Sequence, residues 1–148
     1  MDILSNRSYL KNDQYRTPDK LLARIGLHQA YSRNSEKWLD WVFKQLPLEK
    51  NSCVLDIGCG DGSLWRDRAA IPAEFRLFMA DLSMGMIQKT KTNTGSHKSI
   101  KGWTAADAQM LPFQSGAFNL VIANHMLFHV PDLTMTIQEI IRVLKQSG

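Results

Sequence analysis

Residues 54–62, which read Val-Leu-Asp-Ile-Gly-Cys-Gly-Asp-Gly, constrain the fold of this chain more than any other stretch. Apolar, strand-like residues lead into a loop with glycine at every second position, Gly58, Gly60 and Gly62. Glycine permits tight turns and lets a ligand lie against the main chain. The loop therefore predicts a cofactor site, whereas an ordinary strand–turn–helix needs a single glycine. A helix is expected from about Gly62 to Ala69, with its first N–H groups facing the ligand.

The spacing of the glycines in the loop distinguishes between the classes of cofactor that it could bind. A dinucleotide fingerprint requires G-x-G-x-x-G, and Ser63 stands at the place of the third glycine. The phosphate-loop pattern G-x-x-x-x-G-K-[ST] is absent from the sequence. The loop instead has an acidic residue, Asp56, two residues before its first glycine. It also lacks a basic residue for phosphate, which suits a ligand without phosphate groups.

Apolar runs alternate with helical patterns along the rest of the chain, and this alternation predicts an α/β fold. Strands are expected over 52–57, 76–80, 100–106 and 118–123, and helices over 84–92 and from residue 132. Right-handed crossovers between such strands give a parallel sheet. The 148 residues suffice for one domain. Ligands of these sheets lie outside the carboxyl ends of the strands, so the residues there are the first candidates for a site.

Carboxylates follow the predicted strands at those ends. Asp81 lies nineteen residues after Gly62, where an acid at the second strand can accept bonds from both ribose hydroxyls. The alternative for Asp81 is a helix cap, but Ser83 is available for that role. Asp107 and Ala108 can offer a carboxylate and a backbone N–H to an adenine edge. Apolar contact to the adenine faces is expected from two further residues, Leu82 and Met86.

The first 46 residues are expected to form an arm and two helices. Residues 1–18 are polar and aperiodic and predict an N-terminal arm, and residues 19–46 predict helices that cover the core domain, 52–148. Arg24, His28 and Tyr31 would share one face of the first helix, which either packs on the domain or caps the cofactor crevice. In the second helix, Trp38 and Trp41 are expected to pack inward with the aliphatic residues around them.

The composition of the chain indicates which classes of partner and which cellular compartment to expect. The net charge of +4 is modest, and four scattered lysines at 89, 91, 98 and 101 indicate a solvated face rather than a nucleic-acid surface. No stretch reaches the roughly 20 apolar residues of a membrane span. The first residues lack the apolar core of a signal peptide, so a cytoplasmic protein is expected. Cys53 and Cys59 are interpreted as reduced, buried thiols.

Several of these stretches together resemble the class I S-adenosylmethionine (SAM)-dependent methyltransferases. Residues 56–62 resemble the first motif of that family, Ala80-Asp81 the second, 106–108 the third and 118–130 the fourth. Residues 24–34 and 41–46 look like the N-terminal helices of its small-molecule methyltransferases. The resemblance covers nearly the whole chain and is specific for the cofactor, but it says little about the substrate.

The resemblance implies a Rossmann-like three-layer sandwich with strand order 3-2-1-4, SAM as cofactor, and methyl transfer to a small molecule. Asn124 would lie near the sulfonium. If the acceptor must lose a proton, His125 or His129 is the candidate catalytic base. The cofactor-binding residues that follow from the strand ends and from the resemblance are Asp56, Gly58, Cys59, Gly60, Gly62, Asp81, Leu82, Met86, Asp107, Ala108 and Asn124.

Other functions are weighed against methyl transfer. A non-catalytic SAM-binding or partner-binding domain is the alternative, and a dinucleotide-dependent oxidoreductase is disfavoured by Ser63. No metal site is expected. His125 and His129 have the i, i+4 spacing of a metal site, but Met126 replaces the glutamate and a third ligand is not evident.

The sequence departs from the family at its C-terminus. Family members have seven strands, and the fifth begins soon after a turn like the one at 144–148, where this chain stops. We therefore expect a C-terminally truncated domain whose fourth strand has an unpaired edge. Such a chain should dimerise or aggregate through that edge, bind cofactor weakly and transfer little methyl.

Overall fold

The computed structural model describes residues 23, 26–27, 30–66, 68, 74–95 and 97–146. Residues 1–18 and the side chains of Arg24 and His28 lie outside this part. At the described positions of the first predicted helix, 23, 26–27 and 30–31, the backbone is helical, and Tyr31 is exposed. The elements that follow are α3 (Trp38–Gln45), β1 (Cys53–Ile57), β2 (Arg76–Asp81), α4 (Met84–Thr94), β3 (Ile100–Ala105), β4 (Leu120–Ile122), the 3-10 helix η3 (Leu127–His129) and α5 (Leu133–Val143).

The four strands form one parallel sheet in the order β3-β2-β1-β4, which confirms the predicted fold class and strand order. Val54 of β1 is opposite Leu77 of β2 on one side and Leu120 of β4 on the other. All five residues of β1 are buried, as a central strand covered on both faces requires. This order brings the loops after β1, β2, β3 and β4 to one edge of the sheet.

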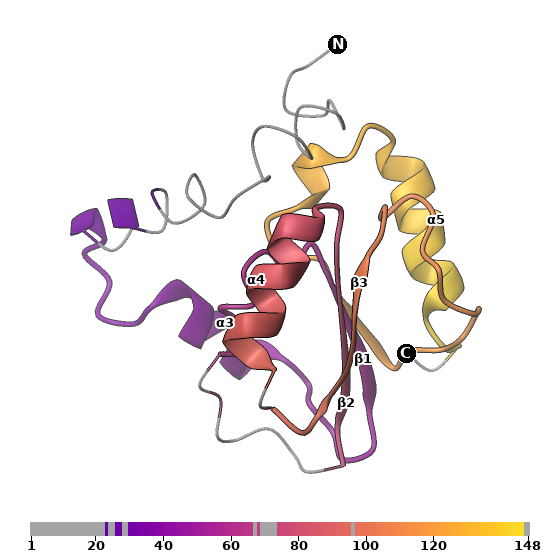
Figure 1. Cartoon of the computed structure of the whole chain (residues 1–148), viewed down its shortest axis with the longest axis horizontal. Coiled ribbons are helices and arrows are strands. Elements are labelled where there is room, and N and C mark those ends of the chain that lie inside the picture. Colours follow the sequence, from indigo (N-terminus) through magenta and orange to yellow (C-terminus); the bar gives the residue numbers. More distant parts are fainter. Residues whose placement is uncertain are drawn as a thin grey trace.

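Helices cover the two faces of the sheet as separate layers (Figure 1). The side chains of β1 point alternately to the two faces of the sheet, because successive side chains of a strand point in opposite directions. Val54 belongs to a cluster with Trp65 and Phe75, against which apolar residues of α3 pack. Leu55 belongs to the opposite cluster, which includes Val143 of α5. Among the described residues, no helix is long and apolar enough to cross a membrane.

Local sequence signals explain where the two longest helices begin. The Ser83 hydroxyl accepts a hydrogen bond from the N–H of Met86 at 3.3 Å and caps α4. The Asp132 carboxylate accepts from the N–H of Met135 at 2.9 Å and caps α5. The cap at Ser83 fixes the direction of the chain between β2 and α4, next to Asp81.

Two local predictions are wrong. Residues 62–66 form turns rather than the start of a helix, although the N–H groups of Trp65 and Arg66 both reach the carbonyl of Gly62, at 3.0 and 3.1 Å. The side chains of Trp38 and Trp41 do not pack inward, since 51% and 45% of their surfaces are exposed. Leu39, Val42 and Phe43 of α3 pack against the core cluster instead, which leaves the two indoles about half exposed.

Candidate functional site

The glycine loop after β1 is closed by its own backbone hydrogen bonds. Gly58, Gly60 and Gly62 have φ values of 68°, 59° and 76°, which glycine adopts without strain. The carbonyl of Ala80, in β2, accepts the N–H groups of Gly58 at 2.8 Å and Cys59 at 3.1 Å. Because these donors are already used, the loop does not present the fan of free N–H groups that binds a phosphate.

Gly58 and Gly62 lie against protein atoms. A Cβ added to Gly58 would lie 2.6 Å from Cβ of Met126, in the segment after β4. A Cβ added to Gly62 would lie 2.9 Å from Cγ2 of Thr90, in α4. The glycine spacing thus serves the packing of the loop between α4 and the segment after β4. Contact of these glycines with a cofactor stays a prediction.

Asp81 connects the glycine loop to the start of α4. Its Oδ2 accepts the N–H of Gly60 at 3.0 Å, and its Oδ1 accepts the N–H of Ser83 at 2.8 Å. Burial raises the pKa of Asp81 to about 6, although both of these N–H groups favour the charged form. Each carboxylate oxygen has two lone pairs, so each can accept a further bond beyond the one described here.

Asp56 lies beneath the loop rather than on its surface. Its side chain is buried, and its Oδ2 accepts a hydrogen bond from Nε1 of Trp65 at 2.7 Å. Burial raises the pKa of Asp56 to about 7, against the lowering effect of the Trp65 bond, and the charge of Asp81 raises it further. Cys59 is also largely enclosed, and burial raises the pKa of its thiol well above the ordinary value. Asp56 and Cys59 therefore support the loop from within.

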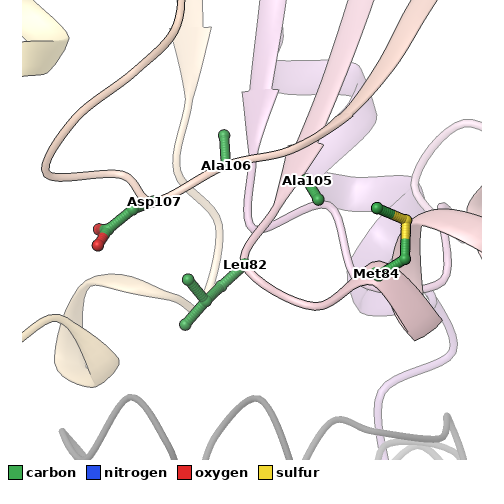
Figure 2. A pocket seen from close by; sticks show the side chains of 5 residues that line it. All are labelled: Leu82, Met84, Ala105, Ala106 and Asp107. Carbon is green, nitrogen blue, oxygen red and sulfur yellow. The ribbon is translucent and has the colours of Figure 1, made fainter.

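A pocket of about 220 Å³ opens at the carboxyl ends of β2 and β3. Five residues line it: Leu82, Met84, Ala105, Ala106 and Asp107. Figure 2 shows that they come from the end of β3 and the residues just after it, from the connection between β2 and α4, and from the first residue of α4. Asp81 immediately precedes Leu82, so its carboxylate belongs to the same strand end. The surface is mostly apolar with one carboxylate, which suits a flat heterocycle with a polar edge.

The structure brings two of the predicted cofactor-binding residues, Leu82 and Asp107, together in this pocket, and their contact with a cofactor stays a prediction. Met86 and Ala108 are buried and do not line it. Met84 lines it instead, with 53% of its surface exposed, and was missed. A helical side chain leans toward the N-terminus of its helix, so the first residue of α4 is the one that reaches the strand ends. That direction is the signal that could have identified Met84.

The segment after β4 holds the other predicted residues. Asn124 is half-buried, and His125 is exposed with a φ of 55°. His129 lies in η3, with its ring centroid 4.2 Å from that of Phe128. The two histidines do not share a helix face, because the chain bends at His125 and only 127–129 are helical. The i, i+4 spacing of His125 and His129 therefore does not place the two rings on one face of a helix.

The sequence profile of the family described as "Methyltransferase domain" matches residues 55–148, from within β1 to the end of the chain. The chain belongs to this methyltransferase domain family. The match includes the glycine loop, Asp81 at the end of β2, Asp107 after β3, and the segment after β4.

Two curated methyltransferases are similar to this methyltransferase domain. A malonyl-[acyl-carrier protein] O-methyltransferase of Legionella pneumophila is 32% identical over 97 residues, which cover 64% of this chain and 33% of that protein. A demethylmenaquinone methyltransferase of Staphylococcus aureus is 31% identical over 113 residues, which cover 75% of this chain and 46% of that protein. The chain therefore spans about a third to a half of the length of these curated relatives.

A solved structure shares the fold. It is a complex between the Haloferax volcanii Trm112 methyltransferase activator and a methyltransferase. The matching chain superposes with a TM-score of 0.71 and 24% identity, over 90% of this chain and 57% of that one. At this identity the similarity establishes the sheet and its layers for the methyltransferase domain, and nothing about its acceptor.

Proposed function

We propose that this chain binds SAM across the carboxyl edge of its sheet and transfers the methyl group to a small molecule. The observation that carries the proposal is the pocket at the ends of β2 and β3, directly after Asp81. Membership of the methyltransferase domain family supports the same assignment. The two curated relatives are named for methylation of a malonyl group on acyl-carrier protein and of demethylmenaquinone, so the class of acceptor is not shared between them.

The residues present fit this cofactor. Each Asp81 oxygen can accept one more bond, which suits two ribose hydroxyls. Leu82, Met84 and Ala106 provide apolar contact for an adenine ring, and Asp107 an acceptor at its edge. Carboxylates at Asp81 and Asp107 make this edge of the sheet attractive to a cationic ligand.

The glycine loop favours a cofactor without phosphates. Its N–H groups at Gly58 and Cys59 are bonded to Ala80, and that at Gly60 to Asp81. A dinucleotide would need several such donors for its pyrophosphate. We therefore propose SAM rather than NAD as the ligand.

When bound, SAM would supply a methyl group that its positively charged sulfur has already activated. The contribution of this chain is to hold cofactor and acceptor at a short distance and in line, and to exclude water. Asn124, after β4, would face the reacting end. An acceptor that must lose a proton could give it to His125 or His129.

Calorimetric titration of the 148-residue chain with S-adenosylhomocysteine, the demethylated product, and separately with NAD tests the cofactor. S-adenosylhomocysteine should bind and NAD should not. Tighter binding of NAD would overturn the assignment. Formation of S-adenosylhomocysteine from SAM and an acceptor then distinguishes a transferase from a domain that only binds the cofactor.

A further inference from the structure

We propose that Trp38, Trp41 and His125 form a binding site for a planar, uncharged aromatic or conjugated ring, and that this ring is the methyl acceptor. The identity of the ring as acceptor rests on the proposed function. The binding of the ring rests on the geometry of these three side chains.

The two indoles form a platform that the protein core does not use. Trp38 and Trp41 stack with ring centroids 5.2 Å apart and planes 26° apart. About half of each side chain is exposed, so neither indole is accounted for by core packing. Exposed neighbouring aromatics are a preferred surface for ligands, because a flat ring that covers them removes apolar area from water.

The His125 ring extends this platform toward the sheet. Its centroid lies 5.3 Å from that of Trp38, with the planes tilted by 59°. The backbone of His125 has a φ of 55°, which is uncommon for a residue other than glycine and is concentrated at functional sites. Close packing of the next residue, Met126, against Gly58 holds the segment in place. The imidazole adds a hydrogen-bonding group beside two apolar rings.

The position of this aromatic cluster fits an acceptor. The pocket lies at β2 and β3, on one side of the sheet order, whereas His125 follows β4, on the other side. The glycine loop after β1 lies between them and contacts Met126. A cofactor held by the pocket and extending past this loop would direct its far end toward the aromatic cluster.

The chemistry of the cluster selects the class of ligand. None of the three side chains is a carboxylate, a lysine or an arginine, so the surface offers no ion pair to a charged ring, and stacking on the two indoles supplies most of the attraction. Stacking needs a flat π-system, and a saturated ring of the same size lacks it. A hydroxyl on the ring would meet the only side chain of the three that can accept a proton, His125.

Two probes with the same carbon skeleton test the proposal, 2-naphthol and decahydro-2-naphthol. Calorimetry with the wild-type chain should show roughly tenfold tighter binding of the flat probe. Trp38→Leu should remove most of that preference, and Trp38→Phe, which keeps a ring, should retain it. Equal affinities of the two probes for the wild type would overturn the proposal, as would an unchanged preference in Trp38→Leu.

A matched control separates this site from general apolar binding. Ile141→Ala removes another exposed apolar side chain, on α5, and should leave the preference for 2-naphthol unchanged. An equal loss in Ile141→Ala and Trp38→Leu would overturn the proposal. S-adenosylhomocysteine titrations of the same proteins keep the two claims apart. Failure of the wild type to bind it refutes the proposed cofactor alone. Absence of ring selectivity in the wild type, with that binding intact, refutes this inference alone.

Discussion

The Oδ2 atom of Asp81 accepts the backbone N–H of Gly60 at 3.0 Å, so the carboxylate of the last residue of β2 is bonded to the loop after β1. One carboxylate thereby fixes the distance between the glycine loop and the pocket at the ends of β2 and β3. The same carboxylate has a raised pKa, because it is buried at this junction. Its charge and its geometry can therefore be tested separately.

Replacement of Asp81 tests its contact with the cofactor. Asp81→Ala should weaken S-adenosylhomocysteine binding by on the order of 1–3 kcal/mol, because buried ribose hydroxyls would lose a charged acceptor. Calorimetry measures the change. Glu49→Gln, at an exposed position before β1, is the control and should bind as the wild type does. Wild-type affinity in Asp81→Ala would place the ribose elsewhere.

The pH dependence of binding follows from the same residue. With a pKa of about 6, the Asp81 carboxylate gains a proton as the pH falls through 6 and loses its charge. If the ionised form binds the ribose, affinity for S-adenosylhomocysteine should fall by roughly tenfold between pH 7 and pH 5. Asp81→Asn, which is neutral throughout, should bind weakly and show a flatter profile. An equally steep profile in Asp81→Asn would assign the dependence to another group.

Asp56 should make the fold less stable as the pH rises. The pKa of this carboxyl is about 7 in the folded protein against an ordinary 3.8, so between these values the folded state keeps a proton that the unfolded state has lost. The free energy of unfolding should therefore fall from about pH 4 to pH 7, by on the order of 4 kcal/mol from this residue.

Asp56→Asn tests this dependence, because an amide oxygen can still accept from Nε1 of Trp65. The variant should lose less stability between pH 4 and pH 7 than the wild type in urea titrations. Asp81 supplies part of the same slope, so the profile should flatten without becoming level. A profile parallel to that of the wild type would show that Asp56 does not titrate in this range.

The chain offers a matched pair of glycines for testing the contact with Met126. Gly58 and Gly116 have φ values of 68° and 65°, but only Gly58 has a neighbour within contact distance of an added Cβ. Gly116→Ala should cost about 1–2 kcal/mol for the left-handed backbone alone. Gly58→Ala should cost about 1–3 kcal/mol more, from the clash with Met126. If thermal unfolding shows the same loss of stability in Gly58→Ala and Gly116→Ala, the segment after β4 moves to accept the added Cβ without cost.

The outer edge of β4 should mediate self-association. Among the described residues, β4 is the last strand on its side of the sheet. The chain after α5 pairs with this side at a single isolated bridge, between Leu144 and Phe118, just before β4 begins. Asn119 donates its N–H inward to Cys53 at 2.7 Å, so by alternation the N–H groups of Leu120 and Ile122 face outward. Light scattering should show dimers or larger species as concentration rises. A monodisperse monomer at high concentration would contradict this.

Local patterns were enough to predict most of the sheet and two helix starts. β1 and β2 differ from their predicted ranges by a single residue each, because an apolar run between turn residues is a local signal. Ser83 caps α4 through a bond to its own near neighbour. Strand β4 is shorter than predicted, since its register with β1 covers only Leu120–Ile122. The helix predicted after Gly62 did not form among residues 62–66.

The sequence by itself determined the parallel α/β architecture and brought Asp81, Leu82 and Asp107 to one edge, since alternation and crossover handedness are properties of the chain. Only the tertiary structure decided which side chains meet there. Met86 does not line the pocket because the packing of α4 on the sheet buries it, and Met84 lines the pocket in its place. Trp38 meets His125 although 87 residues separate them, because packing of α3 and of Met126 sets that contact, and no local pattern encodes it.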